Sequence, residues 1–275
     1  MRRKTLVSGS LLHLVLVVGA IATIVPLVWM VSASLMPAGE ATAFPPRFVP
    51  SRVTIENYRA LFERLDIGRA FMNSVVVALI STLCSLLFNS MAGYAFAKLR
   101  FGGRNRLFAI LVGALAIPAQ VAMLPLFLLL KSVGLVNTYA GVMIPLMATI
   151  YGVFLVRQFM VSIPDDLIAA ARIDGASEWQ IYTRIILPVA RPVLATLAIF
   201  TFMSAWNDFM WPLVILTSDR KYTLPVAIAN LVGEHAQDVE LMMAASVLSV
   251  IPVLLIFFVL QKQYIAGLTS GSVKG

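Results

Sequence analysis

The sequence is poor in the residues that most enzymes use for chemistry. Its 275 residues include one cysteine, Cys84, and two histidines, His13 and His235, and only 12% of the chain is charged. A single cysteine excludes an intrachain disulfide framework, and two histidines far apart in the sequence, neither with a cysteine neighbour, predict no metal site. The chain also lacks a G-x-x-x-x-G-K-[ST] phosphate-binding loop,. We therefore expect neither a metal nor a bound nucleotide in this chain.

Apolar sequence, by contrast, is abundant. Hydrophobic residues make up 60% of the chain, whereas soluble domains average roughly 45–50%. Because several apolar runs exceed the ~20 residues that a helix needs to cross a bilayer, and backbone groups in hydrocarbon must bond internally, we predict an all-α membrane protein with six transmembrane helices. The runs span about 11–36, 71–97, 107–130, 139–159, 193–217 and 239–261. The first is too long for the apolar part of a signal peptide, so we expect it to be a retained span.

The distribution of Lys and Arg predicts the orientation of the spans, because basic residues concentrate on the cytoplasmic side. With a cytoplasmic N-terminus, 13 basic and four acidic residues lie inside, eight of each lie outside, and Asp208 lies within a span. This arrangement accounts for the net charge of +8. We predict cytoplasmic N- and C-termini and no nucleic-acid partner.

The predicted spans divide the chain into three parts. Residues 1–70 hold the first transmembrane helix and the first outer loop, in which "TIENYRALF" predicts a short amphipathic helix. Residues 71–262 form a core of five transmembrane helices, and residues 263–275 form a cytoplasmic tail. The core includes a cytoplasmic loop at 160–192, which we call the 160–192 loop.

The 160–192 loop is unusually polar for a connection between two apolar runs. We expect Ser162 to begin a first helix in a capping-box arrangement with Asp165. The Asp174-Gly175 pair should end it, since glycine tolerates a left-handed turn. Ser177, with Gln180 at the capping-box position, should begin a second helix,. An interfacial helix resting on lipid is the alternative, but its polar face would be basic, so the acidic start of the first helix favours a protein partner.

The stretch "IPDDLIAAARIDGASEWQIYTRIILPVARP" resembles the EAA motif of bacterial ABC importer permeases. "AFMNSVVVALISTLCSLLFNSMAGYAFAKLRF", "SAWNDFMWPLVIL" and the terminal "AGLTSGSVKG" are similar to the carbohydrate-uptake permeases of the maltose or glycerol-3-phosphate type, in particular to the second, six-span permease of each pair. The resemblance implies a type I ABC importer permease fold in the bacterial cytoplasmic membrane. In one respect the chain departs from the pattern, because Ala169 stands where the family has a glutamate.

The resemblance also implies the partners. A non-catalytic subunit of this kind forms a heterodimer with a homologous permease. Two ATPase subunits bind ATP and Mg and hydrolyse the nucleotide. An extracytoplasmic binding protein delivers the sugar. The residues implied to couple to the ATPases are Asp165, Asp166, Ala170, Ala171, Asp174, Gly175, Ala176 and Glu178, with Gly271, Ser272 and Lys274 of the tail as further contacts.

A second group of candidates lies in "SAWNDFMWPL". Asp208 is the only acid that we place inside a span, and intramembrane ionisable residues are costly and often functional. We expect it to line the translocation path or gate together with Trp206, Asn207 and Trp211. The alternative for Asp208 is a structural hydrogen bond to the partner permease. The alternative for the tryptophans is an interfacial aromatic belt.

Three other functions remain open at the level of the sequence. The chain could be an ABC permease for a non-sugar solute such as a phosphate ester. It could be an ion-coupled secondary carrier, although Asp208 offers a single charged group for such a relay. It could also be a membrane scaffold without a transport role.

Overall fold

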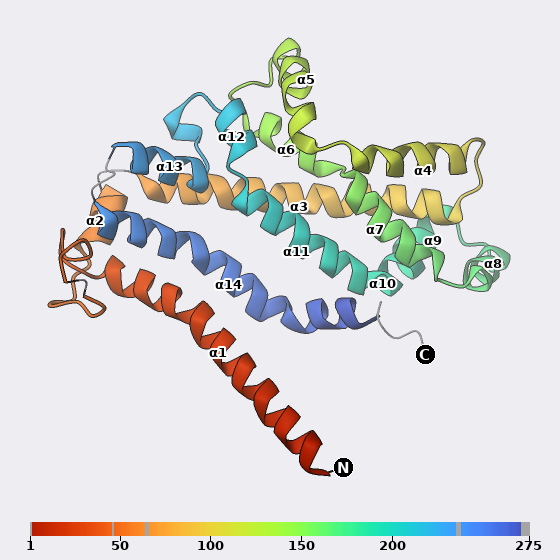
Figure 1. Cartoon of the computed structure of the whole chain (residues 1–275). Helices are drawn as coiled ribbons and strands as arrows, with labels where there is room; N and C mark the ends of the chain where they lie inside the picture. The colour runs from red at the N-terminus through yellow and green to blue at the C-terminus, as the bar shows by residue number, and fades with distance from the viewer. Residues whose placement is uncertain (1, 46, 64–65, 235–237, 271–275) are drawn as a thin grey trace. The chain divides into compact units, whose positions relative to one another are not determined.

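The computed structural model describes residues 2–45, 47–63, 66–234 and 238–270, and these residues form helices without strands. Figure 1 labels the α-helices. In chain order, the helical segments are α1 (Arg2–Ser34), α2 (Glu56–Glu63), α3 (Ile67–Lys98), α4 (Arg104–Gly113), η1 (Ala114–Ala116), α5 (Ala119–Ser132), α6 (Tyr139–Met147), α7 (Ile150–Val161), α8 (Asp165–Ile173), α9 (Glu178–Ile181), η2 (Tyr182–Ile186), α10 (Leu187–Val189), α11 (Arg191–Asn207), α12 (Met210–Ile215), η3 (Asp219–Lys221), α13 (Leu224–Glu234) and α14 (Val239–Ser270). The all-α prediction is confirmed.

The chain divides into two compact units. The first contains residues 1–68 and Ile228–Ile251, and the second contains Arg69–Ala227 and Pro252–Gly275. The predicted division at residue 70 lies close to the first boundary between these units. The predicted core of 71–262 contains Ile228–Ile251, which packs within the first unit.

Within the described residues, four helical segments are long and apolar enough to cross a membrane, and the number rises to six if each of two bent helix pairs is one span. The four are Leu12–Ser34, Ile67–Lys98, Tyr139–Val161 and Val239–Phe258. The bent pairs are Arg104–Ala116 with Ala119–Ser132, at 108°, and Glu178–Val189 with Arg191–Asn207, at 77°. The predicted third run is therefore bent, whereas the 77° bend lies at Ala190, just before the predicted fifth run, which has a break of its own.

Local chemistry explains where these two runs break. In the third run, Ile117 and Pro118 are extended between η1 and α5, and a proline cannot continue the hydrogen-bond ladder of the preceding helix,. In the fifth run, α11 ends at Asn207, and the backbone of Asp208 is extended. The prediction of one uninterrupted helix over 193–217 is wrong, because Asp208 separates α11 from α12.

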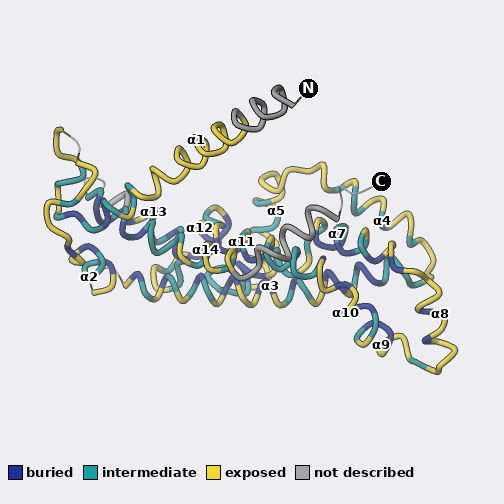
Figure 2. The backbone as a smooth tube through the Cα atoms, turned by 90° about the horizontal axis from the view of Figure 1, so that it is seen from below, coloured by how far each residue is buried: buried dark blue, intermediate teal, exposed yellow. Residues whose placement is uncertain are grey.

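In the first unit, the described part of α1 is largely exposed, and its burial begins near its C-terminal end (Figure 2). The predicted amphipathic helix is confirmed as α2, which buries Asn57 and Leu61. The Asn57 amide donates hydrogen bonds of 2.9 Å to the carbonyl oxygens of Ser34 and Met36. The side chain of Asn57 thus satisfies carbonyls at the end of α1 and fixes α2 against it.

The second unit is built around close contacts among its apolar helices. Helix α7 packs against α4 and α11, and α12 packs against α5 and α6. A Cβ atom added to Gly93 of α3 would lie only 2.7 Å from a methyl carbon of Val156. The absence of a side chain at Gly93 therefore lets α3 and α7 approach closely, as small residues commonly do in membrane bundles.

Trp206 anchors α11 in this unit. Its side chain is fully buried, its ring stacks on Phe202 at 5.9 Å between centroids, and it meets the edge of Phe71 of α3 at 5.5 Å. Aromatic pairs at these separations add to the stabilisation that burial provides. Trp206 is thus a packing residue of the α3–α11 contact.

We expect Trp206→Ala to lower the free energy of unfolding by about 3–5 kcal/mol, the typical effect of removing a large buried aromatic side chain. Trp179→Ala is the matched control, because Trp179 is 60% exposed. The measurement is the thermal unfolding midpoint of the purified chain in detergent. Equal midpoints for the two variants would contradict the packing role of Trp206.

Candidate functional site: the 160–192 loop and an apolar cavity

The first helix of the 160–192 loop is α8, which covers the predicted "LIAAARI" segment. The predicted cap at Ser162 is wrong. The Ser162 hydroxyl donates to the carbonyl of Phe159 at 2.7 Å and so completes the end of α7, while Pro164 occupies the N-cap position of α8 without a side-chain bond. The hydroxyl of Ser162 therefore bonds to a carbonyl group at the end of α7 and not to a backbone N–H at the start of α8.

The turn and the second helix form as predicted. Gly175 has a φ of +80°, the left-handed conformation that favours glycine,. The hydroxyl of Ser177 accepts from the Gln180 N–H at 3.3 Å, and the Gln180 side chain accepts from the Ser177 N–H at 2.8 Å. This reciprocal pair is a complete capping box at the start of α9,.

A π-helix, η2 at Tyr182–Ile186, follows α9 directly and was not predicted from the sequence. Such wide turns are rare and often occur at functional sites. Tyr182 and Ile186 are buried at its two ends. Within the 160–192 loop, this segment connects α9 to α10, and α10 leads across the 77° bend into α11.

Glu178 ties the two helices of the loop to each other and to α3. Its carboxylate accepts from Arg172 Nε at 2.7 Å and from the Tyr94 hydroxyl at 2.9 Å. The Glu178 carboxylate raises the pKa of the Arg172 guanidinium, chiefly through this hydrogen bond. One carboxylate thus joins α8, α9 and α3.

Two further contacts hold the loop to α3. Lys98 Nζ donates to Asp165 Oδ1 at 2.6 Å, and this hydrogen bond holds the pKa of the Asp165 carboxyl below its usual range. The hydroxyls of Ser90 and Tyr182 lie 2.7 Å apart. Together with Glu178, these contacts attach the beginning, the middle and the end of the loop to the C-terminal third of α3.

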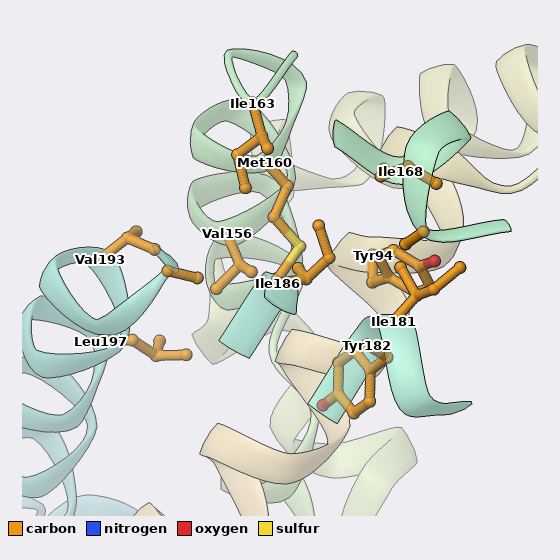
Figure 3. Packing of buried hydrophobic residues seen from close by; sticks show 12 residues of the cluster. Tyr94, Val156, Met160, Ile163, Ile168, Ile181, Tyr182, Ile186, Val193 and Leu197 are labelled. Atoms are coloured by element: carbon orange, nitrogen blue, oxygen red, sulfur yellow. The ribbon is translucent and has the colours of Figure 1, made fainter. Parts of the chain in front are cut away.

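One face of the loop packs against its own chain. Ile168, Ile181 and Tyr182 join a buried apolar cluster with residues of α3, α7 and α11, as Figure 3 shows. Ala171 belongs to the same cluster. Ala171, one of the predicted coupling residues, therefore lies on the inner face of α8, and Ala176 is half-buried.

The opposite face of the loop is open. Ile173 is 86% exposed and Trp179 is 60% exposed, far more than apolar side chains in a packed core. The exposed residues of the loop include the predicted coupling residues Asp165, Asp166, Ala170, Asp174, Gly175 and Glu178, together with Ala169. Asp165 and Glu178 already have partners, in Lys98 and in Arg172 and Tyr94.

A second feature of this unit is a cavity of about 320 Å³ where α6, α7 and α11 meet. Tyr151 and Phe200 form one part of its wall, with their rings edge to face at 6.1 Å. The hydroxyl-bearing side chains of Thr149, Thr201 and Ser204 supply its polar groups, and Leu146 and Leu197 complete the lining. Aromatic faces beside a few hydroxyls are a combination that suits a polar organic solute.

A buried hydrogen-bond chain from α3 supports this cavity. Asn89 is fully buried, and its amide donates to the Ser85 hydroxyl at 2.7 Å, which lies 3.0 Å from the Thr201 hydroxyl. The Asn89 side-chain oxygen accepts from the Thr149 N–H at 3.0 Å, at the break between α6 and α7. The chain therefore positions two of the polar residues that line the cavity.

The predicted path residues lie elsewhere. Trp206 is a core residue, and Trp211 is buried with its indole N–H donating to the Gly141 carbonyl at 3.1 Å. Asp208 accepts from the Trp211 N–H at 3.3 Å and thereby caps α12. Asn207 is exposed, and its amide donates to the carbonyl of Met203 in its own helix. None of these four residues lines the cavity described above.

Sequence reasoning missed the cavity-lining residues, although the sequence contains a signal for them. Leu197, Phe200, Thr201 and Ser204 follow an i, i+3, i+4, i+7 spacing, which places them on one face of a helix,. Pairing that face with Thr149 and Tyr151 required the folded structure. The predicted tail contacts Gly271, Ser272 and Lys274 lie outside the described residues.

Comparisons with known proteins agree with this architecture. Residues 89–269 match the family described as "Binding-protein-dependent transport system inner membrane component". The chain is 38% identical to the arabinooligosaccharides transport system permease protein AraQ of Halalkalibacterium halodurans over 100% of both chains. It is 33% identical to the lactose transport system permease protein LacG of Rhizobium radiobacter over 94% of each. A crystal structure of a bacterial ABC transporter involved in the import of the acidic polysaccharide alginate superposes with a TM-score of 0.84, at 26% identity, over 93% of this chain and 96% of that chain.

We expect Tyr94→Phe to loosen the 160–192 loop without unfolding the bundle. The change removes one hydrogen bond to a charged group, and such bonds contribute about 1.5–3 kcal/mol. Amide hydrogen exchange of residues 165–181 should therefore accelerate about 10-fold or more, while exchange in α11 stays the same. Tyr222→Phe is the control, because no hydrogen bond of the Tyr222 hydroxyl appears among the described contacts. Unchanged exchange in Tyr94→Phe would contradict the anchoring role.

Proposed function

Because this chain belongs to the family of inner-membrane components of binding-protein-dependent transport systems, we propose that it is the permease subunit of an ATP-driven sugar importer. It is a multi-pass membrane protein that forms half of the translocation path. It pairs with a homologous permease, receives its solute from an extracytoplasmic binding protein, and lies in the bacterial inner membrane with both termini in the cytoplasm. The chain is a non-catalytic subunit. Two partner ATPase subunits bind ATP and Mg and hydrolyse the ATP.

The observation that carries this proposal is the two-sided nature of the 160–192 loop. One face is fixed to α3 through Glu178, Lys98 and Ser90, and the other exposes Ile173 and Trp179. An ordered loop with an open apolar face is suited to dock in a groove of another protein. We propose that this face meets the ATPase subunit and transmits its movement to the spans.

Two acidic residues are available to replace the missing family glutamate at Ala169. Asp166 and Asp174 are both exposed, and no hydrogen bond or ion pair of either carboxylate appears among the described contacts. Asp165 and Glu178 are already engaged within the chain. A basic residue of the ATPase would therefore pair with Asp166 or Asp174, at a gain of only ~0–1 kcal/mol for an exposed pair.

The cavity between α6, α7 and α11 supports a sugar as the solute. A sugar presents hydroxyls for hydrogen bonds and apolar C–H faces for aromatic rings, and the cavity offers Thr149, Thr201 and Ser204 beside Tyr151 and Phe200. The names of the relatives point the same way, because they refer to arabinooligosaccharides and lactose. We propose that this cavity is the chain's contribution to the translocation path.

The alternatives fit the chain less well. A phosphate-ester permease would need basic groups along its path, and the described cavity has none. An ion-coupled carrier would need ionisable relays within its spans, yet residues 67–164 contain no acidic residue, and Asp208 caps a helix.

We expect Gly175→Ala to weaken docking of the ATPase. A left-handed backbone costs a residue other than glycine roughly 1–2 kcal/mol, and no atom of this chain lies within 4 Å of the added methyl group. The measurement is the amount of ATPase that co-purifies with the chain in detergent, together with its hydrolysis rate. We expect both to fall about 10-fold.

Gly134→Ala is the matched control, because Gly134 has a φ of +73° and equally open surroundings. It introduces the same backbone strain at the end of α5, away from the 160–192 loop. Purification of the wild-type chain without any ATPase would overturn the importer proposal, and equal losses in the two variants would overturn the role of the loop.

We expect Tyr151→Ala to impair uptake while leaving assembly intact. The change removes an aromatic wall of the cavity, so uptake of radiolabelled arabinose- or galactose-containing oligosaccharides should fall about 10-fold, with unchanged amounts of co-purifying subunits. Phe88→Ala is the control, because Phe88 is an exposed aromatic residue of α3 that does not line the cavity. Equal uptake by the two variants would exclude this cavity from the path.

A further inference from the structure

The turn between α3 and α4 contains a strongly basic pocket that the proposed transport function does not use. Its volume is about 530 Å³, and it is lined by Arg100, Phe101, Gly103, Arg104, Asn105 and Arg106. Gly103 has a φ of +79°, which lets the chain reverse from α3 into α4 within a few residues. The reversal brings three arginines to one small concave surface.

The positive charge of this pocket is largely uncompensated. No hydrogen bond or ion pair of Arg100 or Arg106 appears among the described contacts, and Arg104 donates to the neutral oxygens of Leu99 and Asn105. The nearby acid is Asp165, whose carboxylate is bonded to Lys98 and interacts with Arg100 and Arg104 only through longer-range electrostatics. Since residues 67–164 contain no acid at all, the three guanidinium groups can pair with an external anion.

The position of the pocket restricts the kind of anion. Arg100 lies two residues after the apolar helix Ile67–Lys98, and Arg104 begins the bent pair Arg104–Ala116 with Ala119–Ser132. The first helix, and the bent pair taken together, have the length and apolarity of membrane spans, so the turn between them lies where hydrocarbon gives way to headgroups. An anion that binds here is held at the depth of lipid phosphates.

Apolar side chains extend from the pocket along α4. Phe101 at its rim is 42% exposed, Leu107 is 52% exposed, and Ile110, one turn after Arg106, is 70% exposed. Within the part of the chain that the structure describes, these side chains are left exposed. A ligand that places an anionic group among the arginines would lay attached hydrocarbon along Leu107 and Ile110.

We propose that the Arg100–Arg104–Arg106 pocket is a binding site for the phosphate headgroup of an anionic phospholipid. Arginine forks match the geometry of phosphate oxygens, and basic pockets beside membrane helices commonly hold anionic headgroups. An acidic protein surface would match the charge of the pocket but gives no role to the exposed strip on α4. The inference depends on the chain being embedded in a membrane and is independent of the solute that it transports.

Native mass spectrometry of the detergent-purified complex, titrated with phosphatidylglycerol or phosphatidylcholine, tests the proposal. The variant is R100Q/R106Q, which spares Arg104 because its hydrogen bond to Leu99 supports the turn. The control is R184Q/R191Q, which removes the same charge from two other exposed arginines of the second unit. At roughly 1 kcal/mol per arginine near an anionic lipid surface, we expect about a 30-fold weaker phosphatidylglycerol affinity in the variant.

The expected result is tight binding of phosphatidylglycerol by the wild type, weakened in the variant, retained in the control and restored in R100K/R106K. Equal binding of phosphatidylcholine by the wild type would overturn the proposal, and this arm does not depend on any variant folding. Equal losses of phosphatidylglycerol affinity in the variant and the control would also overturn it, because they would show that the lipid responds to the overall surface charge and not to this pocket. Full displacement of phosphatidylglycerol by inorganic phosphate at equal concentration would assign the pocket to free phosphate instead of lipid.

Discussion

The structure depends on one constraint, which is that polar backbone groups exposed by a helix break cannot be left unpaired in hydrocarbon. At two of the breaks within the apolar part of the second unit, a side chain bonds to a freed backbone N–H group. Asn89 of α3 accepts from the Thr149 N–H at the α6–α7 break. Asp208 accepts from the Trp211 N–H where α11 gives way to α12. These polar residues therefore support two of the breaks, and Thr149, at the break between α6 and α7, also lines the cavity.

The same constraint gives α3 its central role. This helix carries Ser85 and Asn89, which hold the lining of the cavity, and Ser90, Tyr94 and Lys98, which hold the 160–192 loop. The two sets follow each other along the last four turns of α3. A single rigid element thus positions both the candidate solute contact and the candidate ATPase contact, so neither can shift far without the other.

Features set by neighbouring residues could be predicted from the sequence, and features set by distant ones could not. The Ser177–Gln180 capping box and the left-handed Gly175 depend on a few adjacent residues, and both form as predicted. Ser162 lies between two helices, and its hydroxyl bonds to the Phe159 carbonyl of α7 instead of capping α8. The cavity depends on pairing residues 149–151 with residues 197–204, which no local pattern specifies. Asp208 stood out in the sequence because it is an acid in an apolar run. Its hydrogen bond from the Trp211 N–H depends on the break between α11 and α12, which the sequence did not reveal.

Helix α11 offers a direct route between the two candidate sites. It begins at Arg191, at the C-terminal end of the 160–192 loop and directly after η2 and α10. Its residues Phe200, Thr201 and Ser204 line the cavity. The distance along the helix from Arg191 to Ser204 is about 20 Å at 1.5 Å per residue. In the proposed importer, a push on the exposed face of α8 and α9 would tilt α11, because a helix moves as a rigid element over this length. The hydroxyl of Ser85 in α3 lies 3.0 Å from that of Thr201 in α11. A tilt of α11 would strain this contact, and because Thr201 lines the cavity, closure of the ATPases would change the shape of the cavity there.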